Sequence, residues 1–246
     1  MLEQELGLLS YEALASAERA LESWRAKGYQ VLTLSHPDYP ENLRVVDNRP
    51  PLLFVAGSLS PADRRAVSVI GTRQPSASGK ALARDVAQAL GRSGFVVVSG
   101  LAAGIDAEAH RAVLELREGE RGRGARTIAV LGTGLDRVYP PENAALQALI
   151  SREGAVISQF WPEAPPSRQS FPARNAVMSG MTLGSVIVEA SEHSGTRIQA
   201  RQALVQGRIV VLMEPALESA WARDLVERPG VVVARDGADV VGVFRR

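Results

Sequence analysis

Seven short apolar runs between residues 66 and 236 constrain the fold of this 246-residue chain more than any other feature of its sequence. They read AVSVIG, GFVVVSG, RTIAVLG, GAVISQ, GSVIVEA, GRIVVLM and GVVVARD. The runs do not alternate apolar with polar residues, which is typical of parallel strands covered by helices on both faces. Most segments between them are long enough to hold a crossover helix. The sequence therefore predicts an α/β fold, Rossmann-like and doubly wound, with a mostly parallel sheet and helices on both faces.

The first 60 residues follow a different pattern, and we expect them to form a short helical and extended cap beside a main domain at 61–246. Apolar residues recur with a helical period up to Trp24. Two short strands, QVLTLS and PPLLFVAG, are predicted on either side of a proline-rich segment. The acidic N-terminus is unlike a signal peptide and no apolar run is long enough to cross a membrane, so we expect a cytoplasmic protein.

Composition excludes several kinds of site. The chain has no cysteine, which rules out disulfides and thiolate catalysis, and its three histidines leave little for a metal cluster. We expect neither a metal nor a cofactor. The 28 basic and 27 acidic residues give a formal charge of +1, so the chain lacks an overall basic field. Any site for a polyanion must therefore be local.

The loop after the first apolar run is a candidate for such a site, because ligands of doubly wound sheets bind beyond the carboxyl ends of the strands. It reads GTRQPS over residues 71–76. The spacing of Gly71, Gly79 and Lys80 does not fit a P-loop, and no dinucleotide-binding fingerprint is present. What remains is a helix start with free amides, two hydroxyls and Arg73, which can hold a phosphate. The alternative is a capped turn with a solvated arginine.

Each of several other polar residues near strand ends allows a structural and a functional interpretation. Asp106 and His110 stand four residues apart, and we interpret them as a structural pair in which Asp106 holds His110; acid–base chemistry is the alternative. Tyr139 is interpreted as a packing residue, with a base-stacking platform as the alternative. Glu189 ends the fifth run and can serve as a general base or cap amides of a neighbouring loop. The charged residues 117–126 are interpreted as a surface loop, with a nucleic-acid arm as the alternative.

The segment PSRQSFPARN is the most informative stretch for function. Arg168, Arg174 and Asn175 surround Phe171 in a loop that enters a predicted helix. Arginines beside an exposed ring suit single-stranded nucleic acid, because cations follow the backbone while the ring stacks under a base. A core phenylalanine with ordinary surface arginines is the alternative. A second hydroxyl-rich helix start, at residues 194–196, is also able to accept a phosphate.

Taken in order along the chain, these motifs resemble the DNA-processing protein A family, DprA/Smf. The resemblance covers roughly residues 36 to 208. It implies a Rossmann-like domain that binds single-stranded DNA without catalysing a reaction. It also implies a homodimer formed through the later part of the fold, and the recombinase RecA as the partner that is loaded on DNA imported during natural transformation. The motifs that carry it are HPDYPENLR, PPLLFVAG, VIGTRQPSASG, VVSGLAAGIDAEAH, TIAVLGTGLDRVYPPEN, SFPARN, VIVEASEHSGT and QALVQGR.

The resemblance also implies which residues contact DNA. Arg73 would contact a backbone phosphate and Phe171 would stack against a base, with Arg168 as the basic residue that precedes it. The helix start at 194–196 would border the same pocket. The expected DNA-binding residues are Gly71, Thr72, Arg73, Gln74, Ser76, Arg168, Phe171, Arg174, Asn175, Ser194, Gly195 and Thr196.

The chain departs from the family pattern at several positions. Ala173 and Ala176 stand where basic residues are common, and Arg197 stands where an apolar residue is usual. We therefore expect a less basic pocket, with a change in substrate preference or dimer contact. The N-terminal helical segment looks short, residues 117–126 look like an insertion, and no C-terminal winged helix is expected.

Two other functions stay open at this point. A nucleotide-processing enzyme of the lysine-decarboxylase-like Rossmann group would use Glu189 as its base, although the motif P-G-G-x-G-T-x-x-E of that group is missing. A nucleotide-sensing module would use the same phosphate-binding turns without DNA.

Overall fold

The computed structural model describes residues 11–119, 124–192 and 195–245, and within these residues nine strands form one sheet. The strands lie in the order β1-β2-β6-β5-β4-β3-β7-β8-β9. All seven apolar runs and both N-terminal strand predictions correspond to strands, which confirms the α/β fold. Their bounds are Tyr29–Thr33 for β1, Leu52–Gly57 for β2, Ala66–Ile70 for β3, Val96–Ser99 for β4, Arg126–Val130 for β5, Ala155–Ser158 for β6, Gly184–Ile187 for β7, Ile209–Met213 for β8 and Val231–Ala234 for β9.

The sheet is parallel from β6 to β9, whereas β1 and β2 join it by antiparallel pairing. Val55 of β2 lies opposite Ile157 of β6, and both side chains are buried in the same core as Leu32 of β1. The two N-terminal strands therefore extend the main sheet at its edge. The division of the chain near residue 60 stays a prediction.

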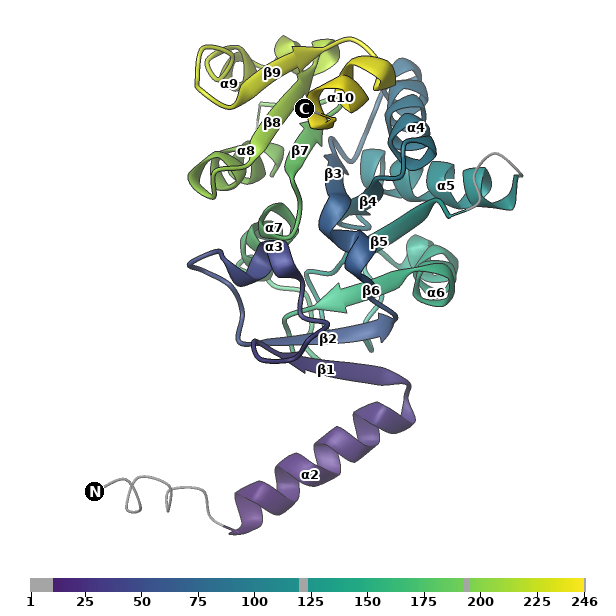
Figure 1. Cartoon of the computed structure of the whole chain (residues 1–246), viewed down its shortest axis with the longest axis vertical. Helices are drawn as coiled ribbons and strands as arrows, with labels where there is room; N and C mark the ends of the chain where they lie inside the picture. The colour runs from purple at the N-terminus through teal and green to yellow at the C-terminus, as the bar shows by residue number, and fades with distance from the viewer. Residues whose placement is uncertain (1–10, 120–123, 193–194, 246) are drawn as a thin grey trace.

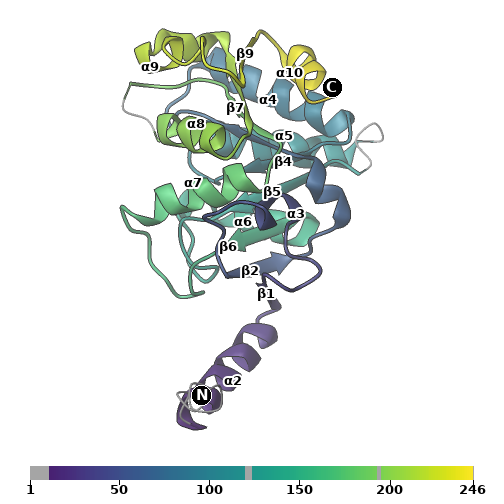
Figure 2. The same ribbon diagram turned by 60° about the vertical axis from the view of Figure 1, so that its left-hand side comes forward.

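Helices cover both faces of the sheet, as the sequence predicts. The helices α4, α5, α6 and α10 pack on one face, and α7, α8 and the short α3 and α9 pack on the other (Figure 1). The helix α2 extends away from the body next to β1 in both views (Figures 1 and 2). The bounds are Tyr11–Ala26 for α2, Glu41–Arg44 for α3, Ala77–Arg92 for α4, Ile105–Glu118 for α5, Ala144–Glu153 for α6, Ser170–Gly180 for α7, Thr196–Val205 for α8, Ala220–Arg223 for α9 and Gly237–Phe244 for α10, with 3-10 turns at Pro61–Arg65, Pro141–Asn143 and Glu214–Glu218.

The strands are apolar throughout because alternate residues fill opposite cores. Val97 of β4 is buried in the same cluster as Val86 of α4. Its neighbour Val98 is buried in the cluster that contains Val177 of α7. Among the described residues, no helix is both long and apolar enough to cross a membrane.

The strand order places the switch point of the sheet between β3 and β7. From β3 the chain moves outward to β4, β5 and β6, and it then returns to place β7 on the opposite side of β3. The connections that leave β3 and β7 therefore diverge, and they open a crevice beyond the carboxyl ends of these two strands. Residues 71–76 follow β3, and residues 188–192 and 195–196 follow β7, so the topology brings together two segments that the sequence predicts to accept a phosphate.

Candidate nucleic-acid interface

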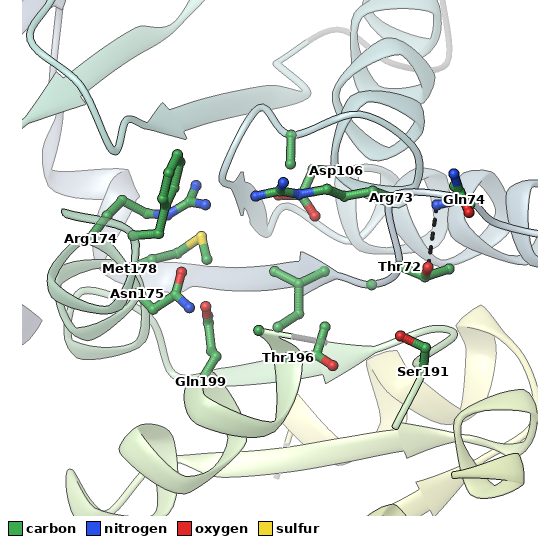
Figure 3. A pocket seen from close by; sticks show the side chains of 15 residues that line it. Thr72, Arg73, Gln74, Asp106, Arg174, Asn175, Met178, Ser191, Thr196 and Gln199 are labelled. Carbon is green, nitrogen blue, oxygen red and sulfur yellow. Dashed lines mark hydrogen bonds between the residues drawn. The ribbon is translucent and has the colours of Figure 1, made fainter. Parts of the chain in front are cut away.

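A cavity of about 520 Å³ lies at this switch point, and we call it the switch-point pocket (Figure 3). Its walls come from the turn after β3, the start of α5, the inner face of α7 and the start of α8. It is lined by Ile70, Gly71, Thr72, Arg73, Gln74, Ala102, Asp106, Phe171, Arg174, Asn175, Met178, Ser191, Gly195, Thr196 and Gln199.

The turn after β3 is held rigidly against its neighbours. The Thr72 amide donates to the Glu189 carbonyl at 2.8 Å, and the Thr72 carbonyl accepts from the Ile105 amide at 3.2 Å. A side chain at Gly71 would collide with Ile105, so this close packing requires glycine there. The turn therefore presents the exposed Arg73 side chain to the pocket from a fixed backbone (Figure 3).

Arg73 lies over an aromatic ring contributed by α7. Its guanidinium carbon is 5.6 Å from the centroid of the Phe171 ring, which is a cation–π contact. Phe171 also meets the ring of Tyr139 at a centroid distance of 5.7 Å. Tyr139 thus packs against Phe171, while 41% of its surface stays exposed. Arg73 and Phe171, together with Arg174, also line a second cavity of about 210 Å³, so these three side chains are accessible from two neighbouring spaces.

Arg174 supplies a second, fixed cation to the pocket. It follows Phe171 by three residues and so shares its face of α7. The side chain is only 6% exposed, and Nη1 donates to the Val130 carbonyl at 2.9 Å. Burial lowers the pKa of the Arg174 guanidinium, and the charge on Arg73 acts in the same direction. A Cβ atom at Gly100 would overlap the guanidinium, which explains the glycine at the end of β4.

Asp106 is the acidic group of the switch-point pocket. Its Oδ2 accepts from the Gly100 amide at 3.1 Å. Burial raises the pKa of the Asp106 carboxyl, while the charge on Arg174 and hydrogen bonds from backbone amides act against this rise. Asp106 therefore ties the loop after β4 to the start of α5 and partly balances the buried arginine.

The expected contact between Asp106 and His110 is wrong. The His110 Nδ1 atom lies 2.7 Å from the Thr127 hydroxyl, so the imidazole is bonded to β5 while Asp106 turns to the Gly100 amide. His110 is completely buried, and burial lowers its pKa to about 3. Both residues have the structural roles that the sequence suggested, but with partners from other elements.

The start of α4 is closed, which corrects the expectation of free amides there. The Glu189 carboxylate accepts from the Ser76 amide at 3.1 Å and from the Ser76 hydroxyl at 2.9 Å. The Ser76 Oγ atom in turn accepts from the Gly79 amide at 2.9 Å. Glu189 therefore caps amides of the neighbouring loop, which was one of its two predicted roles. The anion at this helix start is the protein's own carboxylate.

Nine of the twelve expected DNA-binding residues line the switch-point pocket. Ser76 does not, because it is bonded to Glu189, and the exposed Arg168 precedes α7 without reaching the lining. Ser194 lies outside the described residues. The nine are Gly71, Thr72, Arg73, Gln74, Phe171, Arg174, Asn175, Gly195 and Thr196.

Sequence reasoning missed several wall residues that follow from helical spacing. Met178 lies four residues after Arg174, and Gln199 lies three after Thr196, so each continues the face of a predicted site residue. Ser191 comes from the loop after β7 and has no such signal. Ala176, one of the expected departures from the family pattern, is buried and does not line the pocket.

The charged stretch at 117–126 is only partly described, since residues 120–123 lie outside the described part. Arg117 pairs with Glu153 at 3.2 Å, and Arg126 pairs with Asp63 at 2.7 Å. Both flanking arginines are thus engaged with the protein itself, which favours the interpretation as a surface loop.

A mostly parallel, Rossmann-like sheet with two arginines and an aromatic ring in a pocket at its switch point defines an α/β protein with a cationic site. The chain belongs to the DNA recombination-mediator protein A family, whose model matches residues 30–232. This confirms the resemblance to the DNA-processing protein A family, DprA/Smf.

Individual relatives agree with this assignment. Protein Smf of Synechocystis sp. is 41% identical over 187 residues, which are 74% of this chain and 45% of that protein. DNA processing protein A from Streptococcus pneumoniae has a solved structure that matches with a TM-score of 0.77 and 33% identity, covering 87% of this chain and 74% of that one. This chain thus spans less than half the length of the Synechocystis relative.

A second solved structure has the same fold. It is DNA processing protein A from Helicobacter pylori, reported for its single-stranded DNA binding mode. It matches with a TM-score of 0.74 and 24% identity, covering 88% of this chain and 95% of that one.

Proposed function

We propose that this chain binds single-stranded DNA in the switch-point pocket and acts as a non-catalytic recombination mediator. The observation that carries the proposal is the stack of Arg73 on Phe171, with the buried Arg174 three residues further along α7. A guanidinium fork pairs with phosphate oxygens, and an aromatic ring stacks on any base. The two groups that single-stranded DNA requires are therefore held side by side.

The two arginines have different tasks in this proposal. Arg73 is exposed and can turn its guanidinium from Phe171 to a phosphate, which leaves the ring free for a base. Arg174 is buried and anchored to the Val130 carbonyl, so it holds positive charge at the back of the pocket. Since the whole chain carries a formal charge of only +1, binding depends on this local field.

The partners follow from family membership, and we propose them with the function. They are a second copy of this chain and the recombinase RecA, which would be loaded in the cytoplasm on single-stranded DNA imported during natural transformation. The edge strand β9 is where we place the dimer contact, because Val232 and Val233 are 38% and 39% exposed there.

The site offers less support to the enzymatic alternative. A nucleotide-processing enzyme would need the Glu189 carboxylate as a base near its substrate. That carboxylate instead accepts from the amide and hydroxyl of Ser76, and Glu189 is not part of the switch-point pocket lining. We therefore assign it to the start of α4.

A binding titration tests the proposal. Fluorescence anisotropy of a labelled oligothymidylate and of a duplex would be measured at about 50 mM and 200 mM salt. We expect tighter binding of the single strand and roughly tenfold weaker binding at the higher salt, because phosphate contacts release counterions. Salt-insensitive binding, no binding, or much tighter binding of a mononucleotide would overturn it, the last in favour of a nucleotide sensor.

A further inference from the structure

A second arginine-lined groove lies on the other side of the α8 start from the switch-point pocket. Its volume is about 140 Å³, and it runs between α8 and the segment that contains α9. It is lined by Arg197, Arg201, Trp221, Asp224, Leu225 and Arg228. We call it the α8 groove.

Its three arginines are available to a ligand. Within the described residues, the guanidinium groups of Arg197, Arg201 and Arg228 form neither an ion pair nor a hydrogen bond. Some other arginines of the chain are paired, for example Arg126 with Asp63. Asp224 is the single carboxylate of the α8 groove, so the lining carries a formal excess of two positive charges.

Consecutive residues at the start of α8 line the switch-point pocket and the α8 groove. Gly195 and Thr196 line the switch-point pocket, and the next residue, Arg197, lines the groove. Arg201 follows one helical turn later, about 6 Å along the α8 axis. A strand that leaves the pocket past Thr196 would therefore meet two guanidinium groups in succession.

The chemistry of the groove favours phosphate over bases. Trp221 is only 4% exposed, and its indole N–H donates to the Ser191 carbonyl at 3.2 Å, so its ring offers no stacking surface. Arginine forks beside a closed ring suit backbone phosphates, which every nucleotide carries.

We infer that the α8 groove is a second phosphate-binding site, which holds the backbone of single-stranded DNA as it leaves the switch-point pocket. This inference rests on the proposed function of that pocket. It assigns a sequence-independent role to Arg197, Arg201 and Arg228, and it extends the length of strand bound by one protomer.

The test compares oligothymidylates of two lengths, about 6 and about 20 nucleotides. In the double variant Arg197→Gln/Arg201→Gln we expect roughly tenfold weaker binding of the long strand. Its slope of log K against log salt should fall by about 1.4, because two phosphate contacts are lost. The short strand should bind as it does to the wild type. Arg92→Gln, at the exposed end of α4, is the matched control and should change neither strand.

The outcomes separate the two proposals. If the double variant binds the long strand with unchanged affinity and salt slope while Arg73→Ala loses binding, the role of the α8 groove is overturned. The proposed function of the switch-point pocket then still stands. Absence of binding by the folded wild type would overturn both. If the double variant loses binding of polyglutamate while its DNA binding is unchanged, the α8 groove binds an acidic protein and its assignment to DNA is overturned. Circular dichroism checks the fold of each variant, and Arg228→Gln, outside α8, provides an independent replacement with an expected slope change of about 0.7.

Discussion

The start of α4 and the switch-point pocket lie within a few residues of each other, and both have groups that can bind an anion. They differ in which group occupies them. The start of α4 has glycine, hydroxyl and amide groups, but Glu189 occupies it with hydrogen bonds to Ser76. The switch-point pocket is open and holds Arg73 and Arg174 beside Phe171. Turn composition alone therefore does not identify a ligand site.

The difference is one of charge balance. At α4, the negative carboxylate meets the positive end of the helix dipole, so the protein satisfies its own amides. In the pocket, burial raises the pKa of the Asp106 carboxyl, and the two arginines exceed the single acid.

Replacing Arg174 should have the largest effect. In Arg174→Met, the buried Val130 carbonyl loses its donor and Asp106 loses the nearest opposing charge. We expect the free energy of unfolding to fall by about 3 kcal/mol, measured by urea denaturation. Adding Asp106→Asn should recover part of this loss, and a purely additive double variant would show that the two groups are not coupled.

A matched pair of glycine replacements separates the two regions. A Cβ atom at Gly100 would displace the Arg174 guanidinium, and one at Gly79 would displace the Glu189 carboxylate. Gly100→Ala should therefore weaken binding of single-stranded DNA roughly tenfold, whereas Gly79→Ala should leave it within about twofold. Anisotropy titrations at equal salt measure both, and equal losses in the two variants would contradict the distinction.

Replacing the buried His110 should have a smaller effect on stability, and this effect should depend on pH. Its pKa is about 3 in the folded state and about 6.5 in the unfolded state, so the unfolded chain binds more protons between these values. The contribution of His110 to the free energy of unfolding therefore decreases as the pH is lowered, by about 1 kcal/mol between pH 6.5 and pH 5.5. His110→Gln should remove this difference in urea denaturation. The same replacement at the partly exposed His36 serves as control, and an unchanged slope in His110→Gln would contradict the assignment.

The strands could be predicted from the sequence because burial on both faces leaves a continuous apolar run, as at Val96–Ser99. The meeting of Arg73 with Phe171 could also be anticipated, since Arg73 stands in a motif at the carboxyl end of a strand and Phe171 stands in a motif at the start of a predicted helix. The capping of the α4 start by Glu189 could not be predicted, because Ser76 and Glu189 are 113 residues apart and no local sequence pattern indicates the contact.

Other partners also depend on tertiary packing. The antiparallel pairing of β2 with β6 places the N-terminal strands in the main sheet, which strand periodicity does not reveal. The bond between His110 and Thr127 joins α5 to β5, so helical spacing alone pointed to the wrong partner.

The affinity of two variants for single-stranded DNA tests the central claim most directly. Arg73 faces the open pocket, whereas Lys80, the nearest lysine in the sequence, lies on α4 outside the pocket lining. Under identical salt conditions, Arg73→Ala should raise the dissociation constant at least about tenfold and lower the salt slope by about 0.7, while Lys80→Ala should stay within about twofold of the wild type. Equal affinities of the two variants, or a larger loss in Lys80→Ala, would contradict the account.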